Sequence, residues 1–242
     1  MTVVEETSIR EDVRLWKGLV RTGAWAALAS VGLIVVQIVV YLIWPPPETA
    51  EGFLQMLAAH PVRGLLALDL LYPLSNLLTY LLYLALAVVL WRVSRSAVVL
   101  ALALGTLGMA AYMASPRPVE MLHLADAHAG AGPDEQMALL ATAEGMLATW
   151  TGTAFDVYYL FNFITLLIFG ILVYRSTAFS RATAVWGLAA AALMAVPSNV
   201  GTIGLGFALA SLLPWSVFAA LVARRLLSLC RWAGTGTAGG SR

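Results

Sequence analysis

Two aspartates lie inside long apolar stretches of this chain, and they are the first candidates for a functional site. Each is followed within ten residues by a tyrosine, an asparagine and a threonine. If these stretches cross a membrane, an ionisable side chain at that depth should face a protein interior or a watery cavity, and such residues usually mark functional sites. The candidate ligand-binding residues are Asp69, Tyr72, Asn76, Asp156, Tyr159 and Asn162.

The spacing around the first aspartate predicts one face of a helix. Positions 69, 72, 76, 80 and 83 recur every three or four residues. Pro73 has no N–H, so the carbonyl oxygen of Asp69 should lose its helical partner. A carboxylate beside a free carbonyl could bind a cation, a water chain or a hydroxylated ligand. The alternative is that these polar groups only join neighbouring helices by hydrogen bonds.

A second group of residues could hold a transition metal. Glu120 and His123 are three residues apart and so share one helix face, and His128 and Glu144 follow in the same polar segment. Glutamate and histidine at this spacing ligate metals in helical bundles. Those bundles use the pattern twice, whereas it occurs once here, so a solvated outer face is the simpler interpretation.

The sequence points to no cofactor and away from most enzyme classes. It has no nucleophile elbow, no His-Glu-x-x-His, no phosphate-binding loop and no dinucleotide fingerprint. Its single cysteine, Cys230, excludes an internal disulfide. A net charge of +1 gives no basic field for nucleic acid. The expected partners are a lipid bilayer and a small ligand or ion, and the oligomeric state stays open.

The elements that must position these residues are membrane-spanning helices. Of the 242 residues, 61% are hydrophobic and 11% are charged, whereas soluble domains carry about 25% charged residues. The sequence predicts an all-α membrane protein, a bundle of six transmembrane helices with an extracytoplasmic helical hairpin in the segment 116–150. The six apolar spans are 22–44, 64–91, 96–114, 153–174, 182–197 and 202–223.

Basic residues set the expected orientation. Twelve of the fourteen fall in segments on one side of the six spans, and only Arg63 and Arg117 fall on the other. Because basic residues accumulate in cytoplasmic segments, both termini should be cytoplasmic. We expect a cytoplasmic amphipathic segment at 1–21, a transmembrane domain at 22–225 and a flexible tail at 226–242. Arginine-rich, alanine-rich composition suggests a bacterial inner (cytoplasmic) membrane protein.

Several segments resemble one bacterial family. Residues 68–71 read Leu-Asp-Leu-Leu, and residues 122–126 read Leu-His-Leu-Ala-Asp. The inner turn at 173–181 and the segment 214–226, which runs from Pro-Trp to Arg-Arg-Leu, complete the pattern. Together they resemble the domain-of-unknown-function family number 4386 over about residues 15–228, although Ser180 stands where relatives carry a proline. The resemblance implies a six-helix bacterial membrane protein and brings no activity or catalytic residue.

Three hypotheses follow. The first is a non-enzymatic membrane protein that binds a small ligand, lipid or ion in an outward-facing polar pocket, as a sensor, regulator or minor transporter. The second is an intramembrane, metal-assisted hydrolase acting at the outer surface. The third is a structural or partner-binding protein whose polar groups only pack helices.

Overall fold

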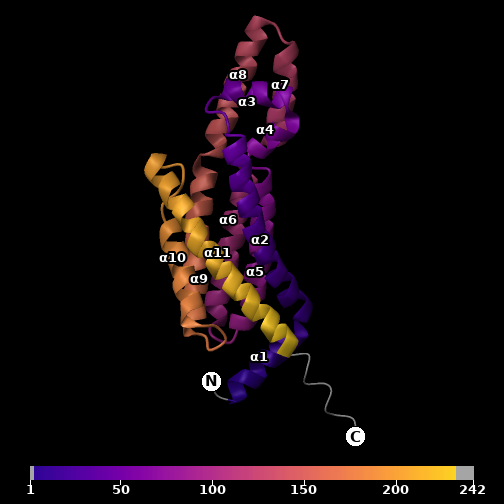
Figure 1. Cartoon of the computed structure of the whole chain (residues 1–242). Coiled ribbons are helices and arrows are strands. Elements are labelled where there is room, and N and C mark those ends of the chain that lie inside the picture. Colours follow the sequence, from indigo (N-terminus) through magenta and orange to yellow (C-terminus); the bar gives the residue numbers. More distant parts are fainter. Residues whose placement is uncertain (1–2, 233–242) are drawn as a thin grey trace. The chain divides into compact units, whose positions relative to one another are not determined.

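The computed structural model describes residues 3–232, and every regular element among them is an α-helix (Figure 1). Helices suit a membrane because their backbone groups satisfy one another's hydrogen bonds in lipid. Most of these helices are also apolar along much of their length. The eleven helices of the described residues are α1 (Val3–Leu15), α2 (Lys17–Ile43), α3 (Ala50–Ala59), α4 (Pro61–Ala67), α5 (Leu71–Leu90), α6 (Arg95–Met113), α7 (Pro118–Gly130), α8 (Pro133–Trp150), α9 (Thr153–Arg175), α10 (Arg181–Met194) and α11 (Gly201–Trp232).

Five helical stretches of the described residues are long and apolar enough to cross a membrane. They are Lys17–Ile43, Leu71–Leu90, Arg95–Gly130, Pro133–Arg175 and Gly201–Trp232. The predicted span 182–197 corresponds to α10, which has only 14 residues. At 1.5 Å per residue α10 is about 21 Å long, against about 30 Å of hydrocarbon in a bilayer. The structure therefore supports five of the six predicted spans by length and composition.

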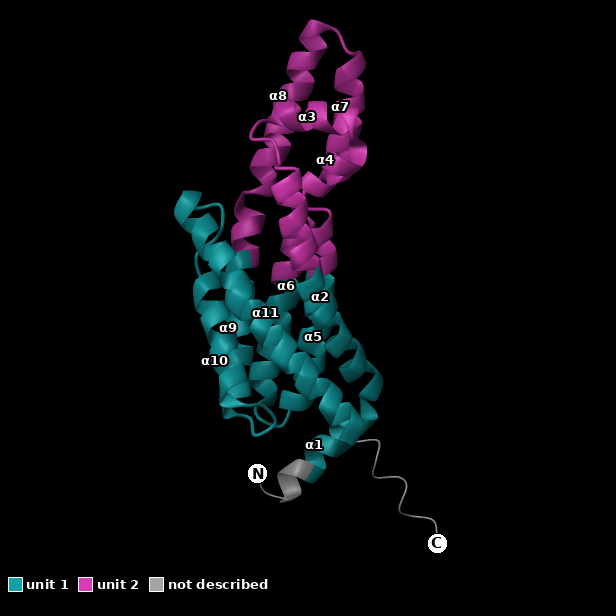
Figure 2. Ribbon diagram, viewed as in Figure 1, with its two compact units in different colours: residues 1–32, 76–107, 159–242 teal, residues 33–75, 108–158 magenta. Residues whose placement is uncertain are grey.

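The chain divides into two compact units (Figure 2). The first unit comprises Met1–Gly32, Asn76–Leu107 and Tyr159–Arg242, and the second comprises Leu33–Ser75 and Gly108–Tyr158. Four of the long helices, α2, α5, α6 and α9, contribute residues to both units. Each unit is described separately below.

Close approach of helices characterises the first unit. A Cβ on Gly23 would lie 2.6 Å from the carbonyl oxygen of Leu81, so no side chain fits there. A Cβ on Gly187 would lie 2.8 Å from the ring of Phe218, where α10 packs on α11. Small residues at such contacts let helix backbones approach and gain van der Waals energy, which is what holds helices together in lipid.

The N-terminal helix α1 is anchored within the first unit. Its Val13 side chain is fully buried. The guanidinium of Arg92 donates two hydrogen bonds to the carboxylate of Asp12, at 2.6 and 3.1 Å. Arg10 lies 3.2 Å from the ring centroid of Trp232, at the end of α11. Helix α11 thus extends to Trp232, into the range predicted as a flexible tail, and residues 233–242 lie outside the described residues.

The second unit contains its own apolar core. Phe53, Leu54 and Leu57 on α3 are buried together with Met121 on α7, and Phe53 packs edge-on against Trp150 with ring centroids 6.3 Å apart. Helices α7 and α8 pack on each other across the short connection at 131–132. The short helices α3 and α4 were not predicted, although the apolar residues of α3 recur at helical spacing.

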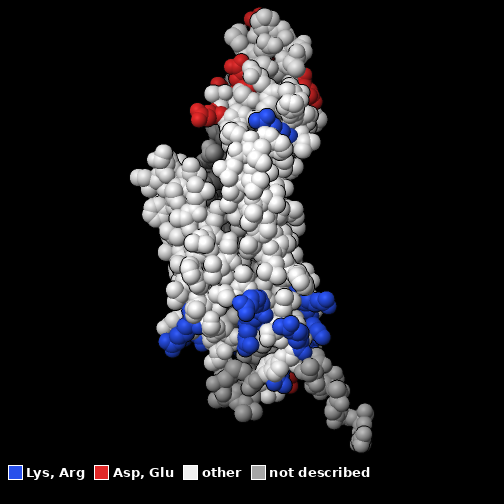
Figure 3. Space-filling view, viewed as in Figure 1, with Lys and Arg blue, Asp and Glu red and all other residues white. Residues whose placement is uncertain are grey.

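Charge differs strongly between the two units. The first holds twelve of the fourteen basic residues, and the second holds nine of the thirteen acidic ones. In Figure 3 the visible basic side chains of the first unit gather at the end of that unit where α1 lies. The visible acidic side chains of the second unit gather around α3, α7 and α8. The boundary between the two compact units therefore follows the charge pattern of the sequence.

Candidate functional site around Asp69

The predicted second span breaks at Asp69, in the second unit. Residues 68–70 separate α4 from α5, and Asp69 has φ 58°, in the left-handed region. Aspartate and asparagine enter this region more readily than other non-glycine residues. The prediction of a continuous helix through Asp69 was wrong. Pro73 lies in the first turn of α5, where a missing N–H costs nothing, so it marks a helix start instead of a kink.

The backbone carbonyl of Asp69 is not free, contrary to the prediction. It accepts a hydrogen bond from the N–H of Tyr72 at 2.9 Å. The turn at residues 68–70 brings the N–H of Tyr72, at the start of α5, to this carbonyl oxygen. The chemistry of the site therefore rests on the Asp69 side chain.

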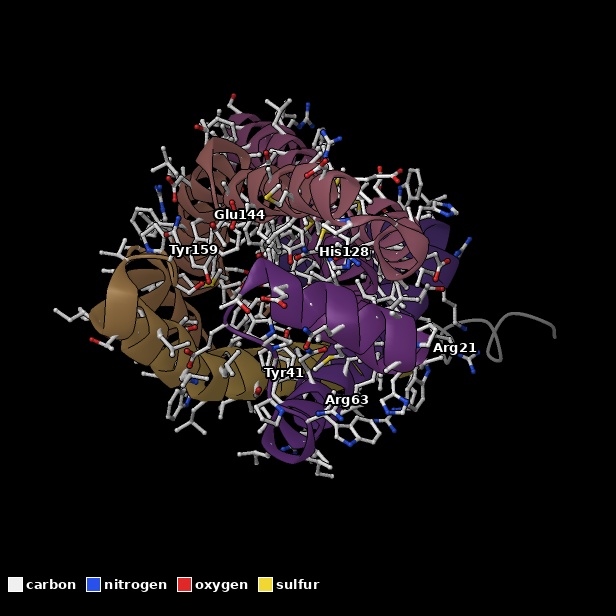
Figure 4. All side chains as sticks on the ribbon, turned by 90° about the horizontal axis from the view of Figure 1, so that it is seen from above. Arg21, Tyr41, Arg63, His128, Glu144 and Tyr159 are labelled. Carbon is white, nitrogen blue, oxygen red and sulfur yellow. The ribbon has the colours of Figure 1, made fainter. Side chains whose placement is uncertain are left out.

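The Asp69 carboxylate links two other helices. Tyr41, near the end of α2, donates a hydrogen bond to Oδ1 (Tyr41 is labelled in Figure 4). Tyr112, near the end of α6, donates to Oδ2 at 3.0 Å. Hydrogen bonds to an ionised group are among the stronger ones in proteins. Neither tyrosine belonged to the predicted set.

Tyr112, which binds this carboxylate, packs against two further tyrosine rings. The Tyr112 ring lies 4.8 Å from that of Tyr72 and 4.9 Å from that of Tyr158, between centroids. The hydroxyls of Tyr72 and Tyr158 share a hydrogen bond of 3.1 Å. Tyr112 is fully buried and Tyr158 nearly so. We refer to Tyr41, Asp69, Tyr72, Tyr112 and Tyr158 as the Asp69 cluster.

Two further polar groups lie beside the Asp69 cluster. The amide of Gln37 lies near the Tyr41 hydroxyl, one helical turn away on α2, and the indole nitrogen of Trp150 lies near the Tyr112 hydroxyl. The side-chain amide oxygen and nitrogen of Gln37 and the indole nitrogen of Trp150 are buried. None of these three atoms forms a hydrogen bond of acceptable geometry in the described residues. A buried polar atom without a partner costs about 1–3 kcal/mol, so a water or a polar ligand would stabilise this arrangement.

The electrostatics of Asp69 follow from its surroundings. Burial raises the pKa of its carboxyl above the ordinary value, and the hydrogen bonds from Tyr41 and Tyr112 oppose that rise. Among the described residues, no basic side chain forms an ion pair with Asp69. A charged group in such a place needs a counter-charge or must become neutral. The carboxyl therefore favours a bound proton or a bound cation.

The other predicted ligand residues fall in different places. Asp156 is exposed in the first turn of α9, where the helix dipole favours a carboxylate. Asn76 and Asn162 are buried in the first unit. Tyr159, also in the first unit and labelled in Figure 4, donates a hydrogen bond to Ser198 at 2.9 Å. Of the predicted set, Asp69 and Tyr72 belong to the Asp69 cluster.

The predicted metal ligands lie on the α7–α8 pair. Glu120, His123 and Glu144 are exposed and His128 is partly buried; Figure 4 labels His128 and Glu144. Because the chain reverses at 131–132, Glu144 should lie about 13 Å further along the helix pair than His128. In the part of the chain that the structure describes, no three His, Cys, Asp or Glu side chains are grouped to hold a metal.

Comparison with known proteins places the chain in a family without naming an activity. No curated protein and no solved structure matches it. The family model for Domain of unknown function (DUF4386) matches residues 21–232, which include every residue of the Asp69 cluster. The chain therefore belongs to the family Domain of unknown function (DUF4386).

Proposed function

We propose that the protein is a multi-pass membrane protein that binds a small cation at the Asp69 cluster and works as a sensor, a regulator or a minor transporter. The observation that carries this proposal is a carboxylate with no basic partner, beside buried polar atoms without partners. Carboxylate, tyrosine hydroxyl and glutamine carbonyl oxygens are hard ligands that suit small cations. Tyrosine faces also attract cations, including organic ammonium groups.

The proposal places the Asp69 cluster toward the outer side of a bacterial inner membrane. The segments of the second unit carry nine acidic and two basic residues, whereas those of the first carry most of the arginines. The preference of basic residues for the cytoplasm then puts both termini inside and the α7–α8 pair outside. This topology needs six crossings, with the 14-residue α10 as the shortest of them.

Thermal unfolding of the purified chain tests cation binding. Unfolding temperatures are measured at neutral pH in Na⁺, K⁺ and NH₄⁺ salts, with N-methylglucamine holding the ionic strength constant. A ligand that binds only the folded state raises this temperature with concentration. We expect one cation to stabilise the wild type and Asp156→Asn, whose carboxylate is exposed in the same unit, but not Asp69→Asn. Equal stabilisation of all three proteins would refute the proposal.

Flux measurements then separate transport from sensing. Protein in liposomes should move the stabilising cation or protons if it is a transporter, and Asp69→Asn should abolish that movement. A wild type that binds the cation without any flux would identify a sensor or regulator. Flux that is indifferent to Asp69→Asn would place the pathway elsewhere.

The two alternatives make different demands. A metal-assisted hydrolase needs Glu120, His123, His128 or Glu144 within about 2.0–2.3 Å of one metal, and metal analysis of the purified protein tests for it. A purely structural role predicts that Asp69→Asn changes stability without changing any ligand response. The same unfolding experiment therefore distinguishes cation binding from packing.

A further inference from the structure

A second candidate site lies in the second unit, apart from the residues of the Asp69 cluster. It is an open groove of about 430 Å³ where α2 ends and α3 passes into α4. Its lining consists of one arginine, one histidine, one aromatic ring and three small or apolar residues: Trp44, Ala59, His60, Pro61, Val62 and Arg63. We refer to it as the Arg63 groove. Among the residues that the structure describes, no acidic side chain lines it.

Arg63 supplies an uncompensated positive charge. Its guanidinium carbon lies 6.0 Å from the ring centroid of Trp44, at the limit of a cation–π contact (both Tyr41 and Arg63 are labelled in Figure 4). Its Nε is buried without a hydrogen-bond partner. Among the described residues it forms no ion pair, although the second unit is rich in acidic side chains. An anion in the groove would satisfy both the charge and the buried N–H.

The surroundings of the groove point to a lipid as the source of that anion. Val62 in the groove is 72% exposed, and the part of α2 that precedes Trp44 exposes several apolar side chains, among them Val35, Val39 and Leu42. These positions recur at helical spacing, so they line one face. In a bilayer such a face meets acyl chains, while tryptophan and arginine at the end of a span lie at headgroup level.

We propose that the Arg63 groove binds an anionic phospholipid, with its phosphate at Arg63 and His60 and an acyl chain along the exposed face of α2. Arginine matches phosphate oxygens with two parallel N–H donors. The apolar walls and the exposed face of α2 favour a lipid over free phosphate, because only a lipid also covers apolar surface. The absence of acidic residues from the lining favours a headgroup with net negative charge over a zwitterionic one.

Native mass spectrometry of the full-length protein in mild detergent tests this proposal, with phosphatidylglycerol and phosphatidylcholine as probes. We expect the wild type to prefer phosphatidylglycerol. Arg63→Gln should weaken that binding about tenfold, because one charge-assisted contact is lost. Arg117→Gln removes the only other arginine or lysine of the second unit and should leave binding unchanged. Equal affinity for both lipids, or equal losses in both variants, would overturn the proposal.

A second pair of variants covers the case in which Arg63→Gln does not fold. Val62 and Val119 are both exposed, and each follows a proline at the start of a helix. Val62→Asp puts a negative charge into the groove and should repel phosphatidylglycerol, whereas Val119→Asp makes the same change elsewhere in the unit. Binding that survives Val62→Asp, or that falls equally with Val119→Asp, would exclude the groove as the lipid site. Unfolding temperatures of both variants establish that they are folded.

Discussion

Polar side chains between helices are used differently in the two units. In the first unit, Ser30, Thr165 and Ser211 each donate a hydrogen bond to a backbone carbonyl oxygen, at 2.9, 3.1 and 2.6 Å. In the second unit, the Asp69 carboxylate accepts hydroxyl groups from two other helices, and polar atoms of Gln37 nearby remain without partners. The first arrangement is complete without a ligand, whereas the second is not.

The sequence suggested two roles for polar residues in the apolar spans, ligand binding and helix packing. The difference between the units separates these roles. Hydroxyl–carbonyl bonds between or within helices are typical of packing in membranes and contribute modestly. A carboxylate with no counter-charge contributes to stability only if a proton or a ligand neutralises it. Variants in each unit should therefore respond to different conditions.

The largest expected effect comes from the close helix contact in the first unit. Gly23→Ala places a Cβ 2.6 Å from the carbonyl oxygen of Leu81 and against the Cβ of Ala85, so α2 must shift. We expect a loss of about 3 kcal/mol, the upper part of the range for overpacking. Gly18→Ala on the same helix meets nothing within 4 Å and should be neutral or slightly stabilising. Chemical unfolding in detergent measures both, and similar stability of the two variants would show that close packing does not hold this unit.

The next effect concerns the carboxylate of the second unit. Tyr112→Phe removes the hydroxyl donor to Asp69 from a fully buried tyrosine, and we expect a loss of about 2 kcal/mol. Tyr80→Phe removes a hydroxyl bonded to Thr106 in an exposed part of the first unit and should cost well under about 1 kcal/mol. The free energies of unfolding of the two variants test the comparison directly. Equal losses of unfolding free energy would mean that the hydrogen bond to Asp69 contributes no more to stability than an exposed bond between two hydroxyl groups.

The third prediction uses pH. Because burial raises the pKa of Asp69, the folded protein binds this proton more tightly than the unfolded chain. The free energy of unfolding should therefore fall as pH rises from about 4, the ordinary carboxyl value, through the raised pKa. We expect the stability difference between wild type and Asp69→Asn to change with pH from 4 to 8, in N-methylglucamine buffers. A stability difference that stays constant over this range would show that Asp69 is not the responsible group.

The smallest effect should come from hydroxyl packing in the first unit. Thr165→Val removes the hydrogen bond to the carbonyl oxygen of Ala101 while keeping the shape of the side chain. Interhelical bonds of this kind are worth about 0.6 kcal/mol on average in membranes. Thr142→Val, whose hydroxyl bonds within its own helix at an exposed position, serves as the control. A loss for Thr165→Val as large as that for Tyr112→Phe would erase the distinction between the two units.

The sequence predicted the helices and singled out Asp69 as a candidate, but it did not predict the geometry around that residue. The run from 64 to 91 is apolar enough to predict one continuous helix. Pro73 was interpreted as an interruption within that helix, but it lies in the first turn of α5. The partners Tyr41 and Tyr112 depend on which helix faces meet. Spans that are apolar nearly all round do not reveal those faces. One visible pattern was missed, since Gln37 and Tyr41 are polar residues four apart in an otherwise apolar span.

The unequal lengths of α10 and α11 make this helix pair sensitive to the membrane around it. Helix α11 has 32 residues, about 48 Å, whereas α10 has 14 residues, about 21 Å. If α10 crosses the membrane as proposed, a thick bilayer leaves it in hydrophobic mismatch, and a thin bilayer forces α11 to tilt or to bend at Pro214. The turn between them is held by the bond from Tyr159 to Ser198. Lipid chain length should therefore change the strain on this turn more than on any other part of the first unit.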